Sequence, residues 1–262
     1  MIEVEHLSKR FGDFTAVNDI SFSVKRGERF ALLGPNGAGK STTIKMLTTL
    51  LKPTSGRLTL DGHDVVKDPD ATRSSFGIVF QDPSLDNDLT AYENMQLHGV
   101  LYGIGKADIS GRIENLLKLV ELWDRRSSLV RTFSGGMRRR LEIARGLLHH
   151  PKVLFLDEPT LGLDAQTRNV LWEYVSNLAK EKEMTILFTT HYLEEAENNA
   201  DRIAIIDHGQ LMRMGTAKQL MQETSTNTLE KAYLALTGRQ IRDEEVDPHE
   251  SWRAIRRSRF MR

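Results

Sequence analysis

The spacing of apolar residues changes several times along this chain, and each change predicts a different element. Apolar and polar residues alternate through the first 30 residues, at Ile2, Val4 and Leu7 and again at Ile20, Phe22 and Val24, which predicts short strands. Short apolar runs predict further strands at 31–33, 58–60, 76–80, 153–156, 185–190 and 203–206. Helical spacing predicts helices over 42–51 and about 165–180, with another after residue 190. Strands that alternate with helices indicate βαβ units and a mostly parallel sheet, so the predicted fold class is α/β.

The stretch 82–150 lacks this alternation and shows helical patterns without a convincing strand. Thr90 and Glu93 have the spacing of a capping box, which predicts the start of a helix. Residues 112–122 carry Ile113, Leu116, Leu117 and Val120 on one helical face. We therefore predict a helical subdomain inserted into the α/β core.

Composition narrows the possible functions. The 262 residues fit one large α/β domain with a small tail, and 39% apolar residues suffice for a sizeable core. Basic and acidic residues balance at 36 each, so no whole-chain field points to nucleic acid or membrane. The absence of cysteine excludes disulfides, thiolate zinc sites and cysteine nucleophiles, and suits a reducing cytoplasm. We expect no signal peptide, and no apolar run approaches the ~20 residues that span a bilayer.

A first glycine-rich segment, from Gly34 to Ser41, matches G-x-x-x-x-G-K-[ST] between a predicted strand and a predicted helix. Its backbone N–H groups can point at phosphate oxygens, with a helix N-terminus behind them. Lys40 should reach the β- and γ-phosphates, and the Ser41 hydroxyl should bind Mg²⁺. An ordinary glycine-rich turn is the alternative, and the strand before and helix after argue against it. The residues expected to bind ATP here are Gly34, Pro35, Asn36, Gly37, Ala38, Gly39, Lys40, Ser41 and Thr42.

Two acids, Asp157 and Glu158, end the apolar run 153–156. The carboxyl ends of strands are where α/β sheets place ligands. We expect Asp157 to orient Mg²⁺ and its waters, and Glu158 to act as general base on the attacking water. The alternative, an acid pair that caps the next segment, has equal weight in isolation and little weight after a phosphate-binding loop.

A second glycine-rich segment lies between the loop and the acids. It consists of Ser134, Gly135, Gly136, Met137 and Arg138, and helical spacing begins directly after the glycines. A serine and two backbone N–H groups at a helix N-terminus form an anion site. Taken alone, the segment is explained by an ordinary helix start capped by Ser134. The position of the segment between the phosphate loop and the two acids favours the anion site.

The order and spacing of these motifs resemble the ATP-binding cassette of ABC transporters over roughly residues 2–220. The resemblance implies a P-loop core with a mostly parallel sheet, an N-terminal antiparallel β subdomain and an inserted helical subdomain at 82–150. It also implies a cassette over 1–222 and a helix and tail over 223–262. Four more residues acquire roles by the same resemblance: Phe11 stacks on adenine, Gln81 contacts Mg²⁺ or water, Asp164 belongs to the D-loop, and His191 contacts the γ-phosphate. The implied catalytic set is Glu158, His191, Gln81 and Lys40, with Ser41, Gln81 and Asp157 at Mg²⁺.

The chain departs from the common pattern at two positions. The signature segment reads Phe133 to Met137 instead of Leu-Ser-Gly-Gly-Gln, and the adenine-side aromatic is Phe11 instead of the more frequent tyrosine. Ser134 and Gly136, which contact phosphate in the family, are kept, and phenylalanine still stacks. The Met-Arg-Arg-Arg variant at 137–140, the run 191–197 and the stretch 229–243 resemble the daunorubicin-resistance, or ABC-2, type of multidrug and antibiotic exporters.

The resemblance further implies how the chain works. Ser134 does not reach the nucleotide held by its own Lys40, so a second copy or a homologous subunit faces it head to tail and sandwiches ATP. Each chain would then act on its partner's ATP through Ser134, Gly135, Gly136 and Met137. ATP favours the closed dimer and ADP the open one. The resemblance implies ATP and Mg²⁺ as cofactors, a separate transmembrane permease as the other partner, and a peripheral location at the cytoplasmic face of the cell membrane.

Two other functions compete with this interpretation. A non-transport relative acting on DNA or the ribosome usually carries long coiled coils, zinc cysteines or fused cassettes, and none is present, so we expect no nucleic-acid partner. An unrelated P-loop enzyme leaves Gln81, His191 and the segment 134–137 unexplained.

The last 40 residues carry two weaker signals. Leu229, Ala232, Tyr233 and Leu236 predict an amphipathic helix packed on the domain or on a twin subunit. Residues 252–262 hold five arginines and no acid, which suits either a solvated disordered end or contact with anionic lipid. The sequence does not reveal the exported compound.

Overall fold

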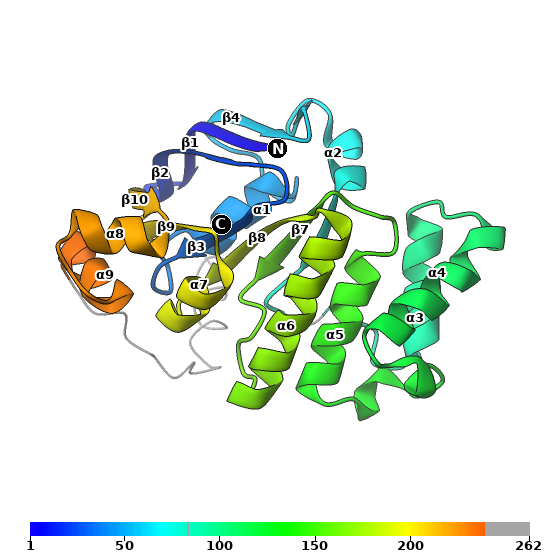
Figure 1. Ribbon diagram of the computed structural model, residues 1–262. Coiled ribbons are helices and arrows are strands. Elements are labelled where there is room, and N and C mark those ends of the chain that lie inside the picture. The colour runs from blue at the N-terminus through cyan, green and yellow to red at the C-terminus, as the bar shows by residue number, and fades with distance from the viewer. Residues whose placement is uncertain (83, 239–262) are drawn as a thin grey trace, which may run out of the picture.

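The computed structural model describes residues 1–82 and 84–238, and two sheets organise them (Figure 1). The smaller sheet is antiparallel and has the order β2-β1-β4-β5. It consists of β1 (Ile2–Phe11), β2 (Phe14–Val24), β4 (Ser55–Leu60) and β5 (His63–Asp64). The alternation in the first 30 residues is therefore that of paired strands with one buried face.

The larger sheet has the order β10-β9-β3-β8-β7-β6 and is parallel except for β10, which pairs antiparallel with β9. It consists of β3 (Arg29–Leu33), β6 (Phe76–Val79), β7 (Val153–Asp157), β8 (Thr185–Thr190), β9 (Arg202–Asp207) and β10 (Gln210–Gly215). Both faces of this sheet carry apolar side chains, because both are buried. Helices α5 to α9 cover one face, and α1 with the smaller sheet covers the other. The predicted α/β class and mostly parallel sheet are confirmed.

Successive residues of a strand point to opposite layers of the core. Phe30 and Leu32 join the cluster formed with α1 and the smaller sheet, whereas Ala31 and Leu33 join the cluster beneath α5 to α9. The helices are α1 (Lys40–Leu47), α2 (Pro69–Ser75), α3 (Ala91–Leu101), α4 (Lys106–Leu119), α5 (Gly135–Gly146), α6 (Ala165–Lys182), α7 (Leu193–Asn199), α8 (Ala217–Glu223) and α9 (Leu229–Thr237). Figure 1 shows α5 and α6 side by side across one face of the sheet, with α3 and α4 beyond them.

The described part of 82–150 contains helices and no strand, as predicted, apart from one isolated bridge between Thr90 and Leu129. Its own apolar cluster includes Ile113, Leu117 and Leu141. Thr90 Oγ1 accepts from Glu93 N at 3.2 Å and Glu93 Oε2 accepts from Thr90 N at 2.8 Å, so the predicted capping box is confirmed.

Several boundaries differ from the sequence-based expectation. The helix expected over 42–51 ends at Leu47, because Thr49 adopts a left-handed φ of 63° and the next two N–H groups both turn back to Lys45 O. The helix expected from Arg112 begins at Lys106. The sequence patterns did not indicate α2, α8, β5 or β10, all of which are short or lie at sheet and domain edges.

The predicted helix around 229–236 packs on its own domain. Leu229 and Tyr233 are buried in the same cluster as Leu220 of α8, and Leu236 packs against it. The division between cassette and tail at 222–223 stays a prediction, and it falls at the end of α8. The arginine-rich residues 252–262, and an acidic stretch at 243–247 before them, lie outside the described residues.

An aromatic stack joins the helical stretch to the sheet. The rings of Tyr102 and His149 lie 3.9 Å apart between centroids, and His98 lies 4.7 Å from Tyr102. His149 Nε2 donates to Phe76 O at 2.8 Å, at the start of β6. Burial, with the nearby Arg145 and His149, lowers the pKa of His98 to about 4.

We expect acid to weaken this stack. Unfolded His98 takes up its proton near pH 6.5 and folded His98 near pH 4, so the unfolded chain binds more protons in between. The free energy of unfolding should therefore fall as pH decreases from 6.5 to 4, by on the order of 1–3 kcal/mol from this group. His98→Phe keeps an aromatic ring without the titrating nitrogen, and urea unfolding at several pH values should show a shallower acid loss. Equal pH dependence in both proteins would contradict this.

Candidate nucleotide site

The first glycine-rich segment connects β3 to α1 and curls around the N-terminus of the helix. Gly37 and Gly39 have φ values of 79° and 102°, which side-chain-bearing residues rarely adopt. A Cβ on Gly39 would lie 2.6 Å from Ala16 O, so the loop also packs closely against β2. Both glycines are therefore required by backbone conformation, and Gly39 also by space. The loop lies between strand and helix as predicted.

Lys40 is 4% exposed, and its ammonium points into the loop and toward the acids. Its Nζ donates to Gly34 O at 2.7 Å and Pro35 O at 3.1 Å, and lies 3.1 Å from Glu158 Oε1. Burial lowers the pKa of Lys40, and the charge of Glu158 opposes this shift. The ammonium therefore has a carboxylate partner in a site that otherwise penalises its charge.

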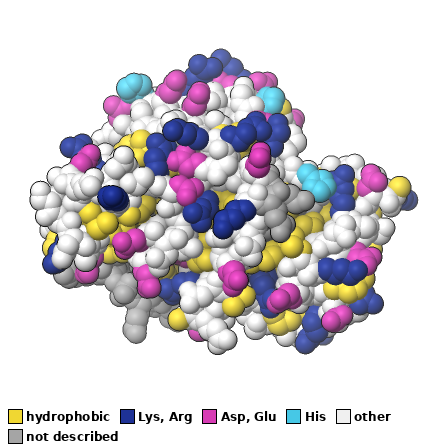
Figure 2. Space-filling model, viewed as in Figure 1, with side chains coloured by type: hydrophobic (Ala, Val, Ile, Leu, Met, Phe, Trp, Pro, Cys, Tyr) yellow, Lys and Arg dark blue, Asp and Glu magenta, His cyan; other side chains and the backbone are white. Residues whose placement is uncertain are grey.

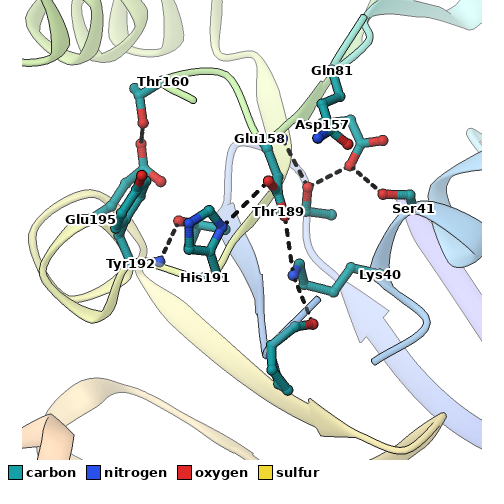
Figure 3. A network of polar contacts seen from close by, with 12 residues as sticks. Lys40, Ser41, Gln81, Asp157, Glu158, Thr160, Thr189, His191, Tyr192 and Glu195 are labelled. Carbon is teal, nitrogen blue, oxygen red and sulfur yellow. Dashed lines mark hydrogen bonds and ion pairs between the residues drawn. The ribbon is translucent and has the colours of Figure 1, made fainter. Parts of the chain in front are cut away.

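Two side chains hold Asp157 at the end of β7 (Figure 3). Ser41 Oγ donates to Asp157 Oδ1 at 3.1 Å, and Thr189 Oγ1 donates to the same oxygen at 2.6 Å. Thr189 also accepts from Glu158 N at 2.9 Å. Burial raises the pKa of Asp157, and the hydrogen bonds from Thr189 and Ser41 counteract part of that rise.

Glu158 combines a strained backbone with close contacts to Lys40 and His191. Its φ is 46°, a left-handed value that costs free energy for a residue other than glycine. Its Oε2 lies 3.3 Å from His191 Nδ1, although this contact is not a regular hydrogen bond. Burial opposes ionisation of Glu158, but His191 and Lys40 together outweigh it and hold the pKa below its usual value. The carboxylate is thus charged and available to accept a proton.

Lys40, Ser41 and Glu158 are among the residues that line a cavity of about 340 Å³. The loop from Pro35 to Thr42 lines one part of it, and Gln81 and Glu158 line another. The aromatic residue in the lining is Phe14, whereas Phe11 lies opposite Phe14 in the β1–β2 pairing, 48% exposed and under Lys9. The assignment of Phe11 to adenine stacking stays a prediction, and the structure adds Phe14 beside it.

The signature segment lies on α5, outside this cavity lining. Ser134 is the N-cap of α5, and its Oγ accepts from Met137 N at 3.3 Å. A Cβ on Gly136 would lie 2.5 Å from Thr167 Cγ2 of α6, so the glycine permits close packing of the two helices. Asp164 caps α6 by accepting from Thr167 N at 3.0 Å. The structure therefore brings the signature segment beside the D-loop, and Gly135, at its start, faces Leu163.

Sequence reasoning missed two residues that hold the site together. Thr189 bridges Asp157 and the Glu158 backbone, as described above. Glu195, 3% exposed, accepts at Oε1 from Thr160 Oγ1 at 2.5 Å (Figure 3) and from Trp172 Nε1 at 2.7 Å. Their side-chain partners come from distant segments, so local spacing gave no signal.

A protein-family model described as ABC transporter matches residues 17–161, which include both glycine segments and both acids. The linearmycin resistance ATP-binding protein of Bacillus subtilis is 42% identical over 87% of this chain and 73% of its own length. The daunorubicin resistance ATP-binding protein of Streptomyces coeruleorubidus is 42% identical over 87% and 72%. The chain belongs to the ABC transporter family. The resemblance to daunorubicin-resistance ATP-binding proteins is confirmed.

Solved structures of this family have the same fold. An ATP-binding subunit of an ABC transporter superimposes with a TM-score of 0.81 at 34% identity, covering 90% of this chain and 99% of that one. A dimeric ATP-binding cassette in a post-hydrolysis state with ADP and Pi superimposes with a TM-score of 0.74 at 28% identity, covering 82% and 98%. This ABC cassette accordingly binds and hydrolyses ATP.

Replacement of Phe11 and Phe14, in the hairpin formed by β1 and β2, tests which ring contacts adenine. Phe14→Ala should weaken ATP binding about 3- to 10-fold, because a ring that lines the cavity can stack on adenine. Phe14→Tyr keeps the stacking surface and should bind as wild type does. Equilibrium dialysis with ATP measures both, with Phe11→Ala in parallel. A loss confined to Phe11→Ala would contradict the role of Phe14.

Proposed function

We propose that this chain is the ATPase subunit of an ABC-2 type exporter of drugs, antibiotics or lipid-like compounds. In this proposal two cassettes close head to tail on ATP, and the closure drives a separate transmembrane subunit. The observation that carries it is the buried group of Lys40, Glu158 and His191 in a cassette whose relatives are resistance and export proteins. One such relative is the Nod factor export ATP-binding protein I of Ralstonia nicotianae, 43% identical over 84% of this chain and 68% of its own length.

The roles of the site residues follow from their positions. Lys40 would bind the phosphates, and Glu158 would take a proton from the attacking water. His191, beside Glu158, would contact the γ-phosphate, and Gln81, which lines the same cavity, would orient the water. Ser134, at the start of α5, is not among the residues that line the cavity of its own chain, which favours action on a partner's nucleotide.

Mg²⁺ fits the oxygen donors next to the loop. Ser41 Oγ and Asp157 Oδ1 lie 3.1 Å apart, and both are hard ligands of the kind that Mg²⁺ prefers. Within the described residues no three His, Asp or Glu side chains form a metal site of their own, so phosphate and water oxygens would complete the coordination. Gln81 is the third proposed protein contact. When bound, the ion would neutralise phosphate charge.

Glu158→Gln tests the assignment of the general base. The amide keeps the size of the side chain but accepts no proton, so turnover should fall by ~10²–10⁴ while ATP still binds. Steady-state ATPase assays and equilibrium ATP binding measure the two properties. The variant should also accumulate as an ATP-bound dimer, which size-exclusion chromatography with and without ATP detects.

Glu194→Gln is the matched control, because Glu194 is exposed on α7 and should leave turnover unchanged. ATPase activity near that of wild type in Glu158→Gln would contradict the assignment. ATP-bound Glu158→Gln that stays monomeric would contradict the head-to-tail dimer.

An apolar stripe supports the permease as a partner. Leu97, Val100 and Leu101 are 51%, 66% and 74% exposed, and their spacing puts them on one face of α3. Exposed apolar patches of this kind mark sites of protein contact. No helix among the described residues has the length and apolarity needed to cross a bilayer. The permease would therefore supply the membrane span, and its docking would hold the cassette at the cytoplasmic face.

Co-purification tests the permease proposal. Glu158→Gln protein extracted from native membranes in mild detergent with ATP should bring a multi-span membrane protein with it, identified by mass spectrometry. Adding Val100→Glu and Leu101→Glu should remove most of that protein, because charge replaces the apolar contact. Leu234→Glu on α9, at the other end of the molecule in Figure 1, is the control. Recovery of ribosomes, DNA or soluble partners alone would favour a non-transport function.

The face of the molecule shown in Figure 2 gives no support to a nucleic-acid partner. Figure 2 shows Lys and Arg side chains interspersed with Asp and Glu over the visible face, without a broad basic area. The formal net charge of the chain is zero. Nucleic-acid binding depends largely on neutralising phosphates with clustered cations, so this face is not suited to it.

A further inference from the structure

Arg139 is the second of the three arginines in the segment 137–140. It is buried between the signature helix α5 and the loops that follow β6 and β7. It lies on α5, one turn after the signature glycines, and is 7% exposed. All five N–H donors of its guanidinium have acceptors. Nε donates to Pro159 O at 3.0 Å, Nη1 donates to Phe80 O and to Glu142 Oε2 at 2.9 Å, and Nη2 donates to Gln81 O at 3.1 Å and Glu158 O at 3.3 Å.

The four carbonyls belong to the two loops that carry the catalytic side chains. Gln81 follows β6 and Glu158 follows β7, and both side chains line the nucleotide cavity. One rigid, planar group therefore fixes the main chain of both residues at once. The contact with Glu158 O also supports the left-handed backbone that this residue adopts at φ 46°.

Glu142 completes the arrangement one helical turn further along α5. It is 1% exposed, so its charge and that of Arg139 compensate each other inside the protein. Its Oε1 accepts from Ser84 N at 2.8 Å. Arg145, on the next turn, donates to Ser84 O at 2.7 Å. The helix thus holds the loop after β6 at Phe80, Gln81 and Ser84.

We propose that Arg139 is a positioning residue for hydrolysis, which ties the geometry of Glu158 and Gln81 to the orientation of the signature helix. Its guanidinium does not face the cavity, so it acts through the backbone of those two residues. The inference rests on the proposed function, because Ser134 at the start of the same helix would contact the partner's ATP. Closure on one nucleotide would then set the catalytic loops of the other site.

The test compares Arg139→Lys with Arg140→Lys in the full chain. Lysine has three donors on one nitrogen and cannot serve four carbonyls in two loops. We expect Arg139→Lys to lower kcat by ~10²-fold, as small misplacements of catalytic groups do, with KM and the Kd for ATP changed less than about 3-fold. Arg140 contacts Val120 O and the exposed Glu121, away from both loops, so Arg140→Lys should keep the wild-type kcat.

A second variant separates positioning from stability. Arg139→Met with Glu142→Met removes both buried charges, and such apolar pairs are often as stable as the ion pair. We expect this double variant to have a Tm closer to the wild-type value than Arg139→Lys has. Its kcat should stay low, because the four backbone carbonyls still lack the guanidinium donor. Recovery of kcat together with Tm would overturn the proposal, as would wild-type kcat in a folded Arg139→Lys protein.

The outcomes are distinct from failure of the proposed function. If Glu158→Gln forms no dimer with ATP, the head-to-tail arrangement is wrong. The positioning role of Arg139 is tested separately, by comparing the change in kcat with the change in KM in Arg139→Lys. A 10²-fold loss of kcat alongside unchanged ATP binding supports positioning. An equal loss in kcat and ATP affinity overturns it, because the residue would then be part of nucleotide binding.

Discussion

The burial of three charges at one edge of the larger sheet constrains the rest of the structure. Lys40, Asp157 and Glu158 are each less than 7% exposed, and each would be costly there without partners. Lys40 and Glu158 neutralise each other, and hydroxyls of Ser41 and Thr189 satisfy Asp157. The pKa of Glu158 is lowered and that of Asp157 is raised, so two neighbouring acids are set apart by their surroundings. Such separation is typical of sites that transfer protons.

Parallel strand order makes this burial possible. The carboxyl ends of β3, β7 and β8 lie side by side, with Leu33 paired to Thr190 and Asp157 paired to Thr189. The loop after β3 therefore meets the acids after β7 and the histidine after β8 at one edge. Helices on one face and the smaller sheet on the other exclude water from the strands, which strengthens every electrostatic contact at their ends.

The helical stretch contributes a second layer of control. The start of α5 packs against the D-loop end of α6 through Gly136 and Thr167, while its middle reaches the catalytic loops through Arg139. The single helix α5 thus contacts the D-loop, which would face a partner, and the loops after β6 and β7, which would take part in ATP hydrolysis. The stack of His98, Tyr102 and His149 fastens the same region to the start of β6. Together these contacts make the loop after β6 the common junction of sheet, helical stretch and nucleotide cavity.

The sequence by itself determined the fold class, most strands, the capping box and the residues of the nucleotide loop, because these depend on local periodicity and short motifs. The two glycine segments and the acid pair also sufficed to identify the family. Only the tertiary structure decided which side chains meet across distant segments. The partners of Thr189 lie 31 and 32 positions away in the chain, and those of Glu195 lie 35 and 23 positions away. The four carbonyls that accept from Arg139 lie 19 to 59 positions away, beyond any local pattern. Phe14 entered the cavity lining for the same reason, since the hairpin's position over the loop depends on Gly39 packing against β2. Local sequence sets propensity and motif, whereas the burial of polar groups forces long-range pairing that is fixed only when the chain has folded.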